Sequence, residues 1–278
     1  MQAWDNGNHP QHAKIGPMGW LRILLRGGAL GAITFGCLGV LLVVRLIERP
    51  LFGMARPVTP HITMFVCRMA FRILGMRRQV MGTPMHGVGA AVANHSSWLD
   101  IFALNASSDI YFVSKSEVAG WPGIGWLARA TGTVFIERNP RRAREHMAQF
   151  TTRLQAGHRL MFFPEGTSTD GRRVLAFKTT LFQPFLGDDL CIQPVTLVYT
   201  APQGADPRFY GWWGDMGFGP HLLQSLAAPR HGGVRVIYHP PRAAQDYDNR
   251  KAFAAQLERD VRDGFEKYLP TNQGTNGL

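Results

Sequence analysis

Cysteine and acidic side chains are both scarce in this sequence of 278 residues. The three cysteines, Cys37, Cys67 and Cys191, are too few and too scattered for a disulfide framework or a Cys-x-x-Cys metal site. A disulfide-stapled secreted domain is therefore not expected. Charged residues make up only 18% of the chain and hydrophobic residues 45%, which excludes a disordered chain and a coiled coil. The length suits one sizeable α/β domain, or a domain with an anchor.

Motifs of several enzyme classes are also missing. The sequence has no Gly-x-Ser-x-Gly elbow, no P-loop, no His-Glu-x-x-His zinc motif and no Gly-x-Gly-x-x-Gly dinucleotide motif. We therefore expect no metal and no redox cofactor.

The shortage of acidic residues leaves a formal net charge of +11, and most of this charge lies near the start of the chain. Residues 1–80 hold ten Lys and Arg against Asp5 and Glu48, which gives +8 and leaves +3 for the other 198 residues. Nucleic-acid binders usually carry their basic residues on a folded recognition surface, whereas a membrane anchor carries them beside an apolar segment. The second pattern is present, so we expect a membrane partner and no nucleic acid.

The apolar segment is residues 27–44, a run of 18 residues without charge between Arg26 and Arg45. At about 1.5 Å per residue a helix here covers roughly 27 Å of a bilayer core that is about 30 Å thick. A spanning helix is one interpretation, and the many glycines leave a half-inserted helix open. A buried core helix is a third interpretation. A signal peptide is a fourth, although no small-residue cleavage site follows the segment. If the helix spans, the denser basic residues after it place the catalytic part in the cytoplasm.

A second helix, basic and amphipathic, is expected over residues 60–78. Its predicted apolar stripe consists of Ile62, Phe65, Val66, Met69, Ile73 and Met76. Such a helix could lie in the membrane interface or pack on the catalytic domain. We therefore divide the chain into an N-terminal membrane anchor, residues 1–80, and a catalytic domain, residues 81–278.

From about residue 85, short apolar runs alternate with helical patterns, which is typical of an α/β fold with a mostly parallel central sheet flanked by helices. The expected strands are Gly89–Ala93, Ile110–Val113, Thr133–Ile136, Arg159–Phe163, Cys191–Tyr199 and Val234–Tyr238. The expected helices are Trp98–Ala106, Ile124–Thr131, Arg141–Ala156 and Asn249–Tyr268.

The first candidate for chemistry is the pair His95 and Asp100, directly after an apolar strand. Five residues apart on one helix, the two side chains would point about 140° apart. They can meet only if His95 precedes the helix and Asp100 lies in its first turn. Asp100 could then fix the imidazole tautomer and leave the other nitrogen as a base. Alternatively, Asp100 merely satisfies a backbone N–H in a helix cap that begins at Ser97.

The second candidate is Phe163-Pro164-Glu165-Gly166-Thr167, where another apolar strand ends. In open α/β sheets ligands bind beyond such strand ends. The alternative is an ordinary glycine turn with a solvated glutamate.

Together, Asn94-His95-x-x-x-x-Asp100 and Phe163-Pro164-Glu165-Gly166-Thr167 resemble the glycerolipid acyltransferase family, typified by 1-acylglycerol-3-phosphate acyltransferase. Weaker blocks occur in the family's order: Gly132-Thr133-Val134-Phe135-Ile136-Glu137-Arg138, Ile192-Gln193-Pro194-Val195, and the helix region between residues 114 and 126. The resemblance covers roughly residues 85–200.

The resemblance implies a membrane-bound O-acyltransferase of lipid biosynthesis. His95 would deprotonate the acceptor hydroxyl of a lysolipid, which then attacks an acyl thioester carried by acyl carrier protein or coenzyme A, while Asp100 orients His95. In this family Glu165 and Gly166 line the acceptor site together with Thr167, and Arg138 helps to hold the polar head of the acceptor.

The sequence departs from the phosphatidate-forming members at residue 168, where they have an arginine and this chain has Ser168. The pattern Glu-Gly-Thr-Ser-x-Asp-Gly-x-x-Val-Leu-x-Phe and the later Tyr210–Met216 segment resemble the branch that acylates lyso-ornithine lipid. A strict lysophosphatidate acyltransferase remains an alternative. A lipid hydrolase that uses the same His/Asp pair on water and a non-catalytic binding module are the alternatives of other classes.

Overall fold

The computed structural model describes residues 4–11, 13–137, 142–186 and 190–270. Its strands are β1 Arg77–Met81, β2 Gly89–Ala93, β3 Ile110–Lys115, β4 Val134–Ile136, β5 Arg159–Phe162, β6 Cys191–Thr200, β7 Gly233–Tyr238 and β8 Arg242–Ala243. Its α-helices are α1 Pro17–Arg22, α2 Gly28–Phe52, α3 Thr59–Leu74, α4 Leu99–Asn105, α5 Ile124–Ala130, α6 Ala143–Gln155, α7 Phe218–Ala227 and α8 Arg250–Tyr268.

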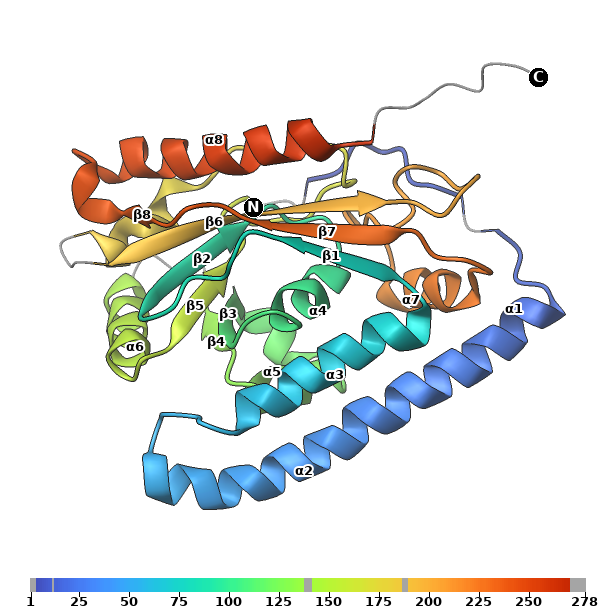
Figure 1. The fold of residues 1–278 in the computed structure, drawn as a ribbon, viewed down its shortest axis with the longest axis horizontal. Helices are drawn as coiled ribbons and strands as arrows, with labels where there is room; N and C mark the ends of the chain where they lie inside the picture. Colours follow the sequence, from blue (N-terminus) through green and yellow to red (C-terminus); the bar gives the residue numbers. More distant parts are fainter. Residues whose placement is uncertain (1–3, 12, 138–141, 187–189, 271–278) are drawn as a thin grey trace.

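The strands form one mostly parallel sheet in the order β1-β7-β6-β2-β5-β3-β4, with β8 paired to β6. Only the β6–β7 and β6–β8 pairings are antiparallel. Helix α8 covers one face of the sheet, while α4 and the N-terminal helices lie on the other side (Figure 1). The predicted fold class is thereby confirmed.

The central strand β2 shows why the sheet needs helices on both faces. All five of its residues are buried, and successive side chains on a strand point to opposite faces. Ala90 and Val92 pack in the cluster that includes Phe253 of α8. Ala91 and Ala93 pack in the cluster that includes Leu99 of α4. This two-sided burial fixes the strand whose end carries the candidate histidine.

The apolar N-terminal helix is longer than the predicted run of residues 27–44. A continuous helical stretch extends from Pro17 to Phe52, 36 residues long, and is apolar and long enough to cross a membrane. A π-helical segment, Ile23–Gly27, joins α1 to α2. Only 6% of its most apolar window is buried. Because the outward side chains are apolar and face solvent in this chain, the helix indicates membrane association.

The predicted helix over residues 60–78 is wrong at its C-terminal end. Helix α3 stops at Leu74 because Gly75 takes a left-handed conformation with φ +69°. Arg77 and Arg78 then belong to β1, which pairs in parallel with β7. The strand has an irregular burial pattern, so periodicity alone did not reveal it. The boundary predicted at residue 80 therefore falls within a strand of the sheet.

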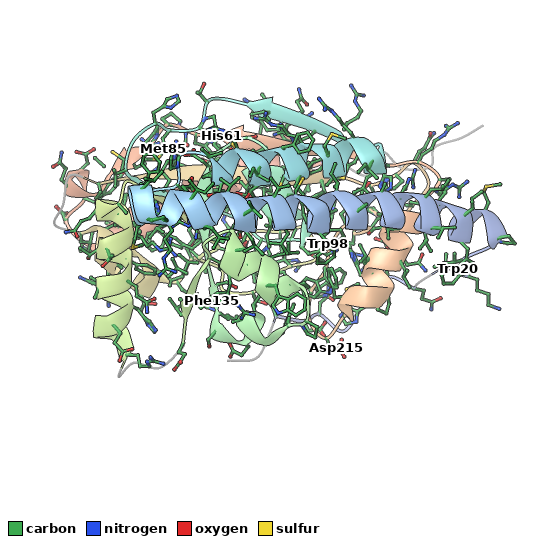
Figure 2. The ribbon with its side chains drawn as sticks, turned by 90° about the horizontal axis from the view of Figure 1, so that it is seen from below. Trp20, His61, Met85, Trp98, Phe135 and Asp215 are labelled. Carbon is green, nitrogen blue, oxygen red and sulfur yellow. The ribbon has the colours of Figure 1, made fainter. Side chains whose placement is uncertain are left out.

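Helix α3 packs on the domain through a face that differs from the predicted stripe. Its buried residues are Thr59, Cys67, Ala70, Phe71 and Leu74, whereas Phe65 of the predicted stripe is 49% exposed. Helix α2 runs alongside α3 and crosses the molecule when it is seen from below (Figure 2). The two helices thus form a layer on one side of the sheet. Helix α7 and the short strand β8 were not predicted.

Candidate active site

His95 and Asp100 meet where β2 ends and α4 begins. His95 lies in the turn after β2, and Asp100 lies in the first turn of α4. The His95 Nδ1 atom is 2.8 Å from Asp100 Oδ2. The Asp100 side chain is fully buried, and 19% of the His95 side chain is exposed. This is the one arrangement in which residues at this spacing can touch, and it leaves His95 Nε2 without a partner among the described residues.

The Asp100 carboxylate collects four hydrogen-bond donors. Besides the His95 ring, Asp100 Oδ2 accepts the backbone N–H of Ser96 at 2.8 Å and of Ser97 at 3.0 Å. Asp100 Oδ1 accepts the Tyr199 hydroxyl at 2.5 Å. The N-cap of α4 is Trp98 and not Ser97, but Asp100 does satisfy backbone N–H groups of the turn, as that alternative expected, and it also holds the imidazole. The two interpretations are not exclusive.

Tyr199 was not identified from the sequence. It lies near the C-terminal end of β6, which pairs with β2 in the register Ala93 to Val195. Side chains two residues apart share a face, so Val195, Leu197 and Tyr199 all point toward α4. Burial and the negative charge of Asp100 raise the pKa of Tyr199 well above its usual value. The phenol therefore stays protonated and donates to Asp100.

The second motif packs directly against the His95 ring. The Phe163 ring stacks on the imidazole with centroids 4.0 Å apart and an interplanar angle of 13°. Thr169 donates its backbone N–H to the His95 carbonyl at 2.9 Å. The loop after β5 and the turn after β2 are thus one unit, built at the carboxyl ends of neighbouring parallel strands. Stacking on one face restricts the orientation of the imidazole.

Glu165 lies beneath this unit and is only 2% exposed. Its Oε1 accepts the His95 backbone N–H at 2.7 Å, and its Oε2 accepts the Leu175 backbone N–H at 2.7 Å. Burial raises the pKa of Glu165 to about 8, and the charge of Asp100 adds to this rise. Both carboxylate oxygens accept backbone N–H groups, so Glu165 helps to fix the position of the turn that carries His95.

Gly166 and Thr167 continue the loop toward the surface. Gly166 has φ +71°, and a Cβ on it would collide with the Lys178 side chain. The left-handed φ is what favours glycine here, because the end of the flexible Lys178 side chain could move aside. Thr167 Oγ1 accepts the backbone N–H of Trp4 at 3.2 Å. The N-terminal segment before α1 thus reaches the second motif, a contact that sequence order does not suggest.

Further contacts hold this N-terminal segment across the loops. Asn6 Nδ2 donates to Asp170 at 3.4 Å, and Asn6 Oδ1 accepts from Trp213 Nε1 at 3.3 Å. The Arg173 guanidinium lies 5.1 Å from the centroid of the Trp4 ring. In Figure 1 the segment, in dark blue, runs past the loop that follows β6. It forms one wall beside the second motif.

The predicted polar-head residue Arg138 lies outside the described residues. The arginines that follow Ser168 are both engaged elsewhere. Arg172 donates to the Pro270 carbonyl at 3.1 Å, and Arg173 binds Asp170 through two nitrogens, at 3.2 and 3.0 Å. The contacts of both arginines are thus with the protein itself.

Among the described residues, one surface group has the side-chain types of a metal site. Asp5, His9 and Asp215 bring their ligand atoms within 4.8 Å of one another. His9 pairs with Asp5 at 3.0 Å and with Asp215 at 3.6 Å, and Asp215 is 88% exposed. These groups hold the N-terminal segment to the Trp213 loop, and we assign no metal to them.

Comparison with known proteins decides the family. A family model described as Acyltransferase matches residues 84–198. A lyso-ornithine lipid O-acyltransferase of Rhodobacter capsulatus is 56% identical over 248 residues, which are 88% of this chain and 90% of that protein. The chain belongs to the acyltransferase family. The resemblance inferred from the motifs is confirmed.

The more distant relatives carry the names of two different acceptor lipids. A lyso-ornithine lipid O-acyltransferase of Brucella abortus is 36% identical to this acyltransferase over 71% of this chain and 79% of the relative. A 1-acyl-sn-glycerol-3-phosphate acyltransferase of Neisseria meningitidis is 34% identical over 64% of this chain and 70% of the relative. The crystal structure of the 1-acyl-sn-glycerophosphate acyltransferase of Thermotoga maritima has the same fold. It aligns with a TM-score of 0.65 at 21% identity, over 90% of this chain and 95% of that one.

The buried Glu165 leads to a prediction with a pH dependence. In Glu165→Gln the amide oxygen can accept one of the two backbone N–H groups, but the NH2 group cannot accept the other. We therefore expect a transfer rate roughly tenfold lower. The ordinary pKa of 4.5 rises to about 8 on folding, so Glu165 contributes stability below pH 4.5 that is lost as the pH rises through 8. The variant lacks this loss. The unfolding temperature of wild type should exceed that of Glu165→Gln by more at pH 5 than at pH 8. The same difference in unfolding temperature at both pH values would contradict the assignment.

Proposed function

We propose that this acyltransferase moves a fatty acyl group from an acyl thioester to the hydroxyl of lyso-ornithine lipid. The observation that carries the proposal is the 56% identity to a lyso-ornithine lipid O-acyltransferase over 90% of that relative's length. Lysophosphatidate acyltransferases are more distant and align over a smaller share of the chain. The alignment leaves about a tenth of either chain outside it, so it covers most of the loops where acceptor selectivity would be decided.

The proposed chemistry needs one base. His95 Nε2 takes the proton of the acceptor hydroxyl as the oxygen attacks the thioester carbonyl, and the C–S bond of the tetrahedral intermediate then breaks. The same proton passes to the thiolate, which leaves as a thiol, so His95 ends the cycle neutral. Asp100 stabilises the imidazolium formed in between and keeps Nδ1–H directed at itself. The ester product and the thiol balance the two substrates.

The acceptor would lie beside the loop of Glu165, Gly166 and Thr167, with the N-terminal segment as a wall. A phosphate head needs a free guanidinium fork, and this loop has Ser168 where that fork would stand. Arg173 is neutralised by Asp170 at 3.0 Å. The polar head of lyso-ornithine lipid is a zwitterionic amino acid, so its recognition does not require a phosphate fork. Gly166, Thr167 and Arg138 remain proposed binding residues, and Glu165 acts through the His95 turn.

Membrane association brings both lipids to this site. We place α1 and α2 in the membrane, and if this helix spans it, Arg45 and Arg49 after the apolar segment put the sheet on the cytoplasmic side. In this division the N-terminal residues anchor the protein, and the rest of the chain carries the reaction.

The function is tested by offering the purified full chain lyso-ornithine lipid and lysophosphatidate in turn, each with acyl carrier protein and coenzyme A thioesters. We expect thiol release that depends on lyso-ornithine lipid, and a diacyl product identified by mass. Preference for lysophosphatidate would establish the strict phosphatidate-forming alternative. Fatty acid released without an acceptor would establish the hydrolase.

A further inference from the structure

A pocket between the C-terminal half of α2 and the helices α5 and α6 gathers positive charge away from the candidate active site. Its volume is about 780 Å³, within the range of roughly 300–1,000 Å³ that is common for ligand sites. Five arginines line it: Arg45, Arg49, Arg56, Arg129 and Arg153. No acidic side chain lies among its lining residues in the described part of the chain. We call this the arginine pocket.

The guanidinium groups of the arginine pocket repel one another. Burial, and then the charge of Arg45, lower the pKa of Arg56. Burial lowers the pKa of Arg153, and Arg45 adds to this. The neighbouring His158 has its pKa lowered to about 4, by burial first and then by Arg153. Charge is thus crowded in a half-buried place, which costs free energy unless a counter-charge is supplied.

The protein supplies little of that counter-charge. Arg56 donates to the Ala130 carbonyl at 2.7 Å and Arg129 to the Ala119 carbonyl at 2.6 Å, and neither acceptor carries a charge. Within the described residues Glu48 is the carboxylate that pairs with the cluster, 3.2 Å from Arg45. The Arg56 Nε atom is buried and has no hydrogen-bond partner in the described part of the chain. Water or an anion could accept from this donor, and only an anion would also offset the charge of the surrounding guanidinium groups.

The arginine pocket also has apolar lining residues. Leu38 and Leu42 of α2 and Trp126 of α5 line it, and 50% of Leu42 and 63% of Trp126 are exposed. Leu38, Leu42, Arg45 and Arg49 follow one another at spacings of three or four residues and so share one side of α2, whose ribbon crosses the molecule in Figure 2. A ligand that satisfies both the arginines and the apolar residues has an acidic head and hydrocarbon tails.

We propose that the arginine pocket binds one anionic phospholipid, with its phosphate among the guanidinium groups and its acyl chains along Leu38, Leu42 and Trp126. The membrane that receives α2 is the source of this lipid. The bound lipid joins α2 to α5 and α6 and fixes the height of the catalytic sheet above the bilayer. This inference concerns a site outside the proposed acyl transfer and does not depend on the identity of the acceptor.

The position of the arginine pocket separates it from the reacting groups. Arg153 of α6 contacts His158, the residue before β5, at 3.2 Å, whereas His95 follows the carboxyl end of β2. The two strands are parallel, with Gly89 opposite Arg159. Four to five residues at about 3.3 Å each place roughly 15 Å between these two edges of the sheet. The lipid is therefore a bound partner and not the acyl acceptor.

Native mass spectrometry of the full chain in neutral detergent tests the proposal with phosphatidylglycerol, phosphatidylcholine, inorganic phosphate and coenzyme A as probes. We compare wild type with Arg49→Gln/Arg129→Gln, because both side chains are exposed and their loss leaves the fold intact. The matched control is Arg250→Gln/Arg259→Gln on α8, which removes the same charge from the other face. Unfolding temperatures show that all three chains are folded.

We expect one phosphatidylglycerol to bind wild type and the control equally, and the Arg49/Arg129 variant to bind it roughly thirtyfold more weakly, because two phosphate-facing charges are lost. Phosphatidylcholine should bind wild type at least about tenfold more weakly than phosphatidylglycerol. Equal phosphatidylglycerol binding by all three chains overturns the proposal. Displacement of the lipid by coenzyme A reassigns the pocket to the acyl donor, and displacement by inorganic phosphate alone shows an anion site without lipid specificity.

Discussion

His95→Ala should lower the rate of acyl transfer roughly 10⁴-fold, because the variant loses the proposed general base of the reaction. The fold should survive this change. The imidazole is 19% exposed, and Asp100 keeps the donors Ser96, Ser97 and Tyr199 after the ring is removed. The measurement is lysolipid-dependent thiol release under saturating acceptor and donor, together with thermal unfolding of the same preparation.

His86→Ala is the matched control, since His86 is an exposed imidazole in the loop before β2. It should keep wild-type transfer. Wild-type rates in His95→Ala would show that His95 is not the base. A rate loss accompanied by unfolding would show instead that the ring is a packing element beneath Phe163.

The sequence carried enough information to locate the reacting pair because local geometry decides it. His95 and Asp100 are five residues apart, at a strand end and a helix start, so contact between them depends on one turn. The strand β2 was predicted with its bounds because it is apolar and ends where polar residues begin. Short-range patterns of this kind can be recognised without knowing the rest of the fold.

The partners of this pair could not be found in the same way. Tyr199 is 99 residues from Asp100 along the chain, and Trp4 is 163 residues from Thr167. Such contacts follow from strand order and from the path of the N-terminal segment, which no local period encodes. Glu165 is predicted to line the acceptor site, and that stays a prediction, whereas its burial with two backbone donors is a tertiary property that its motif does not reveal.

The role of Asp100 can be separated from its structural contacts with Asp100→Asn. The amide oxygen can still accept from the His95 ring, Ser96 and Ser97, and the NH2 group can donate to the Tyr199 hydroxyl, so the turn is retained. The negative charge that stabilises the imidazolium is lost. We expect transfer to fall roughly 10²- to 10³-fold, less than in His95→Ala, with little change in unfolding temperature.

Tyr199→Phe provides the opposite test of the same carboxylate. Removing the phenol leaves Asp100 Oδ1 buried without its 2.5 Å donor, which should cost about 1–3 kcal/mol of unfolding free energy. The charge and the contact with His95 at 2.8 Å remain, so transfer should fall less than about tenfold. Activity lost mainly in Asp100→Asn and stability lost mainly in Tyr199→Phe would assign the charge to the reaction and the phenol to the fold. If both variants lost activity and stability in the same proportion, Asp100 would act only as the cap of α4, because a single structural role predicts parallel losses.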